Sequence, residues 1–428
     1  MRAYTPRLVD KQLQILLEGL AAVNVEGARG VGKTRTAQEH AATFIPLDDP
    51  EERQHLMSLG RNMFRHIATP MVLDEWQLMP EIWDRVRRAV DDDPTPGRFI
   101  LTGSASPTQA PVHTGAGRIV NLRMRPMTLV ERGMDQPIVS LKHLLSGRQD
   151  TPIEGSTKVA LGDYVQEILC SGLPGIRDLS SAARRAQLDA YIDQTTRHDL
   201  SDGTTRRARS LKDWLAAYAA SVSTTASFTE IARLASKDLD APVAATTTRG
   251  YRDLLESMWV LDPLRGWSPS ENEFARITTS DKHQLCDPAL AARLLNLDAD
   301  ALLGTGLPTT RPTSHIPRRA RMLGPLFESL VTQSVQVYAA LCNARVSHLR
   351  TKAGAQEVDL IVEGPGRQIV AIEVKTTATP RPGDTKHLLW LRQRLGERLA
   401  DAVVITTGRY AYRDEDGIAV IPAALLGP

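Results

Sequence analysis

The stretch of residues 27–34 constrains the fold of this chain more than any other. It reads Gly-Ala-Arg-Gly-Val-Gly-Lys-Thr and matches the phosphate-loop pattern G-x-x-x-x-G-K-[ST] at every constrained position. The pattern requires a strand before the loop and a helix after it, and the sequence indicates a strand over 21–25 and a helix over 36–43. Because glycines let backbone N–H groups curl around an anion, the stretch predicts a phosphate site on an α/β sheet.

Two side chains at the end of this loop carry chemistry. Lys33 would reach the β- and γ-phosphates of a nucleotide, and the Thr34 hydroxyl would ligate Mg²⁺. The loop leads into a helix whose positive N-terminal end favours phosphate. The predicted nucleotide-binding residues are Gly27, Ala28, Arg29, Gly30, Val31, Gly32, Lys33 and Thr34.

An apolar strand over 71–75 ends in two carboxylates. In phosphate-loop enzymes the first acid at this place, here Asp74, holds the Mg²⁺ shell. The second, Glu75, would polarise the attacking water as a general base. Many strands end in acids because they reach the surface, so the pair alone is weak evidence for a metal and base site. The phosphate loop upstream makes this interpretation strong.

The next strand, over 98–104, ends in hydroxyl residues. Thr102 or Ser104 would sense the γ-phosphate or orient the water, although a strand-ending turn also favours such residues. Arg118 follows two glycines and would neutralise charge developing on the γ-phosphate, in its own or a neighbouring subunit. The alternative for Arg118 is a solvated arginine at the start of a strand.

These strands alternate with helices, one of them predicted over 80–90. Such alternation predicts a parallel sheet with helices on both faces. The nucleotide would then lie at the carboxyl ends of the strands, as open α/β sheets require.

The motifs G-A-R-G-V-G-K-T, V-L-D-E-W-Q, F-I-L-T-G-S and G-A-G-R, followed by L-R-M-R-P-M-T-L-V-E-R-G, resemble the AAA+-type P-loop ATPases of bacteria and archaea. In that family the ATPase module is fused to a C-terminal domain of unknown function. The specific motifs lie within residues 20–133. The resemblance implies the AAA+ sheet order and ATP as the nucleotide, whereas the residues alone indicate a nucleoside triphosphate.

Residues 160–300 are predicted to be mainly helical. Within them, 227–262 resembles a winged helix, in which Thr248, Arg249 and Arg252 would face a DNA groove or phosphates. Winged helices also serve as packing or protein-contact modules. The basic runs 206–209 and 318–321 are further candidates for phosphate contacts, although short charge runs are usually solvated.

A hairpin over 357–375 carries the other chemical signal. Its strands, 357–362 and 369–375, would bring Asp359 beside Glu373, with Lys375 on the same face as Glu373. The two carboxylates would hold a divalent metal, with a third from Glu328, and Lys375 would orient or deprotonate water for phosphodiester attack. Glu-x-Lys on a strand is also an ordinary exposed cross-strand pattern.

This set of residues resembles the PD-(D/E)XK restriction-endonuclease-like fold, a signature that the C-terminal module of the same ATPase family carries. The predicted fold class is therefore α/β: an AAA+-type P-loop parallel sheet, a helical winged-helix-like middle and a restriction-endonuclease-like α/β module. The predicted boundaries are 1–135 for the ATPase domain, 136–304 for the middle, 305–321 for a linker and 322–428 for the nuclease-like module.

Composition bounds the remaining questions. At 428 residues the chain is expected to form two to three domains, and a net charge of +2 does not indicate a polyanionic partner at the level of the whole chain. The three cysteines are isolated, the first residues lack a signal-peptide core and no apolar run would span a bilayer, so a cytoplasmic protein is expected.

The functional prediction is Mg²⁺-dependent ATP hydrolysis that drives a conformational change coupled to a nuclease-like module acting on nucleic acid. One alternative is a nucleotide-dependent switch or scaffold that recruits a protein or DNA, with a catalytically silent C-terminal module. A second alternative is an ATP-dependent nuclease that acts on foreign or damaged DNA. An oligomer is compatible with each of these hypotheses, because many AAA+ sites form between subunits.

Overall fold

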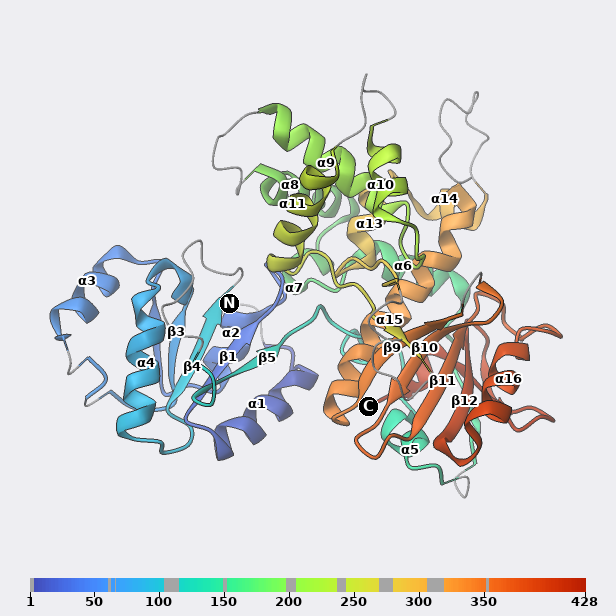
Figure 1. The fold of residues 1–428 in the computed structure, drawn as a ribbon, viewed down its shortest axis with the longest axis horizontal. Coiled ribbons are helices and arrows are strands. Elements are labelled where there is room, and N and C mark those ends of the chain that lie inside the picture. Colours follow the sequence, from blue (N-terminus) through green and yellow to red (C-terminus); the bar gives the residue numbers. More distant parts are fainter. Residues whose placement is uncertain are drawn as a thin grey trace. The chain divides into compact units, whose positions relative to one another are not determined.

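The structure is a computed structural model that describes residues 4–60, 63–65, 67–103, 115–148, 152–197, 205–236, 244–268, 280–305, 319–351 and 354–428 (Figure 1). The chain divides into two compact units. The first comprises Met1–Pro126, Leu173–Gly175 and Leu255–Val260, and the second comprises the remaining residues. The division into three domains and a linker stays a prediction.

The first unit is built on a five-stranded parallel sheet, with the order β2-β3-β4-β1-β5. The strands are β1 (Ala22–Glu26), β2 (Thr43–Pro46), β3 (Met71–Asp74), β4 (Phe99–Gly103) and β5 (Ile119–Arg123). The predicted parallel sheet is confirmed. Every residue of β3 and β4 is buried, as expected of parallel strands covered on both faces.

Helices alternate with these strands: α1 (Leu8–Gly19), α2 (Lys33–Glu39), α3 (Pro50–Ser58) and α4 (Glu81–Asp92), with a 3₁₀ turn, η2 (Trp76–Leu78), after β3. The predicted helix over 36–43 was placed too late, because α2 begins at Lys33 inside the phosphate loop and Thr43 already belongs to β2. A helix that starts at the loop aims its free N–H groups at the phosphate position.

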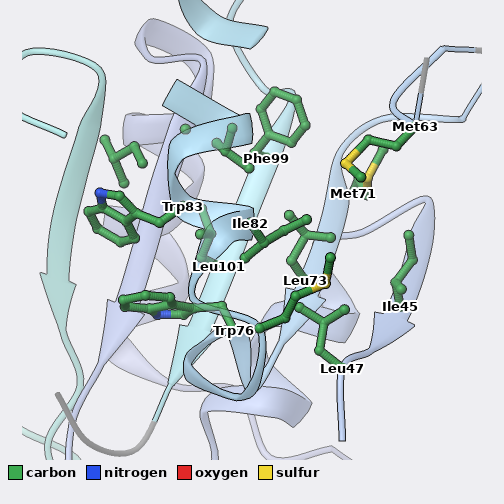
Figure 2. Packing of buried hydrophobic residues seen from close by; sticks show 14 of the residues in the cluster. Ile45, Leu47, Met63, Met71, Leu73, Trp76, Ile82, Trp83, Phe99 and Leu101 are labelled. Atoms are coloured by element: carbon green, nitrogen blue, oxygen red, sulfur yellow. The ribbon is translucent and has the colours of Figure 1, made fainter. Parts of the chain in front are cut away.

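The core of the first unit lies between the sheet and α4 (Figure 2). Helix α4 buries Ile82, Trp83, Val86 and Val90, which share one face at helical spacing. The ring centroids of Trp83 and Trp76 lie 4.6 Å apart, so the 3₁₀ turn packs on the same core. This packing holds the chain just after β3, where the candidate catalytic acid lies.

The second unit begins with helices: α5 (Leu141–Leu145), α6 (Leu161–Cys170), α7 (Pro174–Arg177), α8 (Ser181–Arg197), α9 (Thr205–Ala219), α10 (Phe228–Ala235), α11 (Ala245–Ser257), α13 (Pro288–Leu294) and α14 (Ala299–Leu303). Helices α7 and α11 each contribute residues to both units. Ser227 caps α10 through a capping box with Glu230. After α11, Leu261 and Leu264 form antiparallel bridges with Leu285 and Lys282. The winged-helix assignment stays a prediction.

The sheet of the second unit has eight strands in the order β7-β13-β14-β12-β11-β10-β9-β8. They are β7 (Gly155–Ser156), β8 (Gly266–Trp267), β9 (Arg345–Arg350), β10 (Glu357–Glu363), β11 (Ile369–Val374), β12 (Leu399–Thr406), β13 (Tyr410–Arg413) and β14 (Ala419–Pro422). Strands β9, β10 and β11 pair antiparallel, and β12 runs parallel to β11. A separate pair joins β6 (Val139–Ser140) to β15 (Leu426–Gly427).

Two longer helices accompany this sheet, α15 (Leu323–Leu341) and α16 (Lys386–Leu395), together with the 3₁₀ turns η3 (Arg319–Met322), η5 (Gly396–Arg398) and η6 (Ala423–Leu425). Leu388 and Leu391 of α16 pack with Val358, Ile361 and other buried residues of the sheet. Among the described residues, no helix combines the length and the apolar character that crossing a membrane requires.

Candidate active site and a buried charge cluster

The phosphate loop leaves β1 and turns on three glycines with positive φ, which are Gly27 (151°), Gly30 (78°) and Gly32 (105°). A Cβ on Gly27 would lie 2.1 Å from the carbonyl oxygen of Met124, which no side chain tolerates. The loop is therefore a backbone cradle whose shape depends on glycine.

Lys33 is buried within this loop. Its Nζ donates hydrogen bonds to the carbonyl oxygens of Gly27 (2.9 Å) and Ala28 (3.0 Å). Burial lowers the pKa of Lys33 to about 8, although the charges of Glu75 and Asp74 oppose the shift. A phosphate would offer this ammonium stronger, charged partners than two carbonyls do.

Thr34, Asp74 and Thr102 meet at the carboxyl ends of the strands. The Thr34 hydroxyl donates to Asp74 Oδ1 at 2.9 Å, and the Thr102 hydroxyl donates to the same oxygen. The parallel register places Asp74 opposite Thr102. Burial raises the pKa of Asp74, and these two hydrogen bonds oppose the rise. A buried carboxylate beside a threonine hydroxyl is a donor set that fits Mg²⁺.

Glu75 follows β3 in a left-handed backbone conformation (φ 54°), which is uncommon for a residue with a side chain. Its Oε2 accepts a hydrogen bond from the side-chain amide of Gln77, a contact that sequence reasoning missed. A Cβ on Gly103, at the end of β4, would lie 2.7 Å from Gln77 Oε1, so that glycine makes room for the amide. The motif V-L-D-E-W-Q contains Gln77 but gives it no role.

Arg7 is a second residue that sequence reasoning missed. Its guanidinium donates to the carbonyl oxygens of Val31 (2.7 Å) and Arg125 (2.8 Å). Because these carbonyls lie in the phosphate loop and after β5, the buried Arg7 ties the two segments together. A lone arginine near the start of a chain carries no sequence signal for this role.

The other predicted ATPase residues have different positions. Ser104 lies outside the described residues, whereas Thr102 joins the cluster described above. Arg118 Nε lies 2.7 Å from Asp91 Oδ1, and its side chain is 46% exposed. Its proposed role in neutralising the γ-phosphate stays a prediction.

The predicted basic contacts are only partly described. Thr248 is buried, so it does not face a groove as expected, and Arg252 Nη2 lies 2.8 Å from Asp253 Oδ1. Arg249, Arg209 and Arg321 are exposed. The side chains of 206–208 and 318–320 lie outside the described part of the chain.

The predicted residues of the C-terminal module converge. Strands β10 and β11 pair Leu360 with Ile372, which places Asp359 and Glu373 opposite each other one residue further along. Asp359 Oδ2 accepts a hydrogen bond from the Val374 backbone N–H at 2.9 Å. Lys375 Nζ donates to Glu373 Oε2 at 2.7 Å.

Lys282 joins this cluster, and sequence reasoning missed it. Its Nζ lies 2.8 Å from Glu328 Oε1 and 3.1 Å from Asp359 Oδ1, and its side chain is only 1% exposed. Burial alone would lower the pKa of Lys282, but the charges of Asp359 and Glu328 outweigh it and raise the pKa. No local pattern reveals the contact, because 77 residues separate Lys282 from Asp359.

Burial changes the pKa values of the carboxyl groups in this cluster. Burial, and after it the charge of Asp359, raises the pKa of Glu328 to about 8 and also raises the pKa of Glu373. Within the described ranges, no three carboxylate, imidazole or thiol groups are arranged to hold a metal ion. The predicted metal ligands Glu328 and Asp359 share the Lys282 ammonium group, and their role as metal ligands stays a prediction.

Comparison with known proteins finds family matches in three parts of the chain. Residues 21–132 match the family described as an AAA domain, 161–301 match a domain of unknown function (DUF8612) and 323–426 match another (DUF4143). The "Uncharacterized protein Rv2008c" of Mycobacterium tuberculosis is 27% identical over 363 residues, which are 82% of this chain and 68% of the relative. "Uncharacterized protein Mb2031c" of Mycobacterium bovis matches to the same extent. The N-terminal part of the chain is therefore similar to AAA domains, and its C-terminal part is similar to DUF4143 domains.

Proposed function

We propose that the first unit binds ATP with Mg²⁺ and hydrolyses it. The observation that carries this proposal is the meeting of Thr34, Asp74 and Thr102 at the strand ends, beside a buried Lys33. A glycine cradle, a buried lysine and a carboxylate–hydroxyl pair are the parts that phosphoryl transfer requires. The match to the AAA domain supports ATP as the nucleotide.

Each side chain has a separate task in this proposal. Lys33 would exchange its two carbonyl partners for phosphate oxygens. Thr34 and Asp74 would hold the Mg²⁺, which screens the charge of the phosphates. Glu75 would accept a proton from the attacking water, and Gln77 would orient the Glu75 carboxylate.

Replacing Lys33 with alanine tests the proposal. We expect ATP turnover to fall at least about 100-fold, because one preorganised cation on the transferred phosphate is lost. Phosphate release measures the effect, and Lys11→Ala, at an exposed lysine of α1, is the matched control. Turnover in Lys33→Ala close to that of the control would sink the ATPase assignment.

We further propose that ATP turnover drives a conformational change that is transmitted to the C-terminal module. The order α15-β9-β10-β11-α16-β12 supports its resemblance to the PD-(D/E)XK fold. The position of Lys282 between Glu328 and Asp359 favours a module that binds a protein or DNA partner without cutting nucleic acid. The module would then work as a nucleotide-controlled recruiting surface.

A cleavage assay separates recruitment from cutting. We expect single- and double-stranded DNA to stay intact with wild-type protein and Mg²⁺ or Mn²⁺, with or without ATP. The nuclease alternative predicts cutting that Asp359→Ala and Lys375→Ala each abolish while ATP turnover persists. Cutting that both variants retain would indicate a contaminating nuclease.

A further inference from the structure

The cation position of the C-terminal cluster is defined by two carboxylate oxygens. Lys282 Nζ lies 2.8 Å from Glu328 Oε1 and 3.1 Å from Asp359 Oδ1. A divalent ion bound by the same oxygens would have ligand distances of about 2.0–2.6 Å and would therefore occupy nearly the same point. The ammonium and a divalent ion cannot be present there together.

The charge of the cluster is already close to balance. Four carboxyl groups (Glu328, Glu357, Asp359 and Glu373) face the two ammonium groups of Lys282 and Lys375 and the guanidinium of Arg350, which pairs with Glu357. Adding a divalent ion to this set would leave excess positive charge in a poorly solvated place, which is costly. Removing one ammonium would reverse the balance.

The backbone around Lys282 is held in place. Its N–H and C=O groups both bond to Leu264, at 2.8 and 2.9 Å. The next residue, His283, donates its N–H to the Thr224 carbonyl at 2.8 Å, and its ring nitrogen lies 2.7 Å from the Ala226 carbonyl. The ammonium thus comes from the 161–301 domain, whereas the carboxylates belong to the 323–426 domain.

One carboxylate oxygen of Glu373 makes no hydrogen bond to the described residues. Its side chain is only 5% exposed, and within the described residues its Oε1 has no hydrogen-bond partner. A buried carboxylate oxygen without a donor is costly, and once the Lys282 ammonium is removed this oxygen is available as a further ligand for a divalent ion.

We propose that the Lys282 ammonium permanently replaces a divalent cation in the C-terminal module, and that Glu328, Asp359 and Glu373 form a Mn²⁺ or Mg²⁺ site only when this ammonium is removed. The inference deepens the proposed recruiting function and rests on that proposal, in which the C-terminal module does not cut nucleic acid. Its test measures cation binding, so its failure is separate from the outcome of a cleavage assay.

Mn²⁺ titration of the full, nucleotide-free chain tests this proposal, with free Mn²⁺ followed by electron paramagnetic resonance. We expect Lys282→Gln to bind one more Mn²⁺ per chain than wild type does. Its affinity for this ion should be at least about tenfold higher than any affinity of wild type at the same site. Lys282→Gln/Asp359→Asn should lose that gain. Lys282→Arg, which keeps a cation, should behave as wild type.

Thermal unfolding gives a second readout. We expect Mn²⁺ to raise the Tm of Lys282→Gln and to leave the Tm of wild type unchanged. If Lys282→Gln is unfolded without metal, Mn²⁺ should restore its folding, and failure to do so contradicts the proposal. A wild-type Mn²⁺ site that Asp359→Asn removes, or a folded Lys282→Gln without a new site, would also overturn it.

Discussion

Replacing Glu75 with glutamine is expected to stop ATP turnover while ATP binding persists. Glutamine keeps the shape of the side chain but cannot accept a proton from the attacking water. General-base catalysis contributes about 10²–10⁴-fold, so kcat should fall by that factor. The ATP affinity should not weaken, because Lys33 and the glycine cradle, which would hold the phosphates, are unchanged.

Two measurements on the same preparations check this result. Phosphate release gives the turnover, and a fluorescent ATP analogue gives the affinity. Glu81→Gln is the matched control, since Glu81 is an exposed acid in the first turn of α4, close in sequence to Glu75. If Glu75→Gln lost binding and turnover together, Glu75 would be a structural residue rather than the base.

Replacing Asp287 with alanine is expected to produce the largest loss of stability. The side chain is fully buried, and its oxygens accept hydrogen bonds from the Ser171 hydroxyl (2.9 Å) and from the N–H groups of Gly172 (2.6 Å) and Ala289 (2.8 Å). Its charge also favours the ionised form of the fully buried Arg132. Alanine would leave three donors and a buried cation without this partner, at a cost of about 3–5 kcal/mol.

Urea denaturation followed by circular dichroism measures the free energy of unfolding. Asp298→Ala is the control, because Asp298 also caps a helix of the second unit, α14, but is exposed. Loss of an exposed cap costs about 1 kcal/mol. Equal effects of the two substitutions would mean that the buried network around Asp287 adds nothing beyond a cap.

Local patterns predicted which residues of the candidate nucleotide site lie together, because these residues lie in short, regular segments. Apolar runs before the phosphate loop and before Asp74 form neighbouring parallel strands, whose carboxyl ends bring Thr34, Asp74 and Thr102 together. The start of α2 was misplaced because helix propensity does not reveal that the loop itself begins the helix at Lys33. Arg7 and Gln77 were missed because neither residue type has a characteristic pattern at its position.

The sequence by itself determined the glycine-rich loop, the acids Asp74 and Glu75 at the end of β3 and the hairpin that pairs Asp359 with Glu373, because each depends on neighbours along one strand or turn. Only the tertiary structure decided which cation those C-terminal carboxylates meet. Lys282 reaches Asp359 across 77 residues through packing between separate segments. Charge balance in a buried cluster depends on every charged group that folding brings together, and a sequence motif identifies only some of these groups.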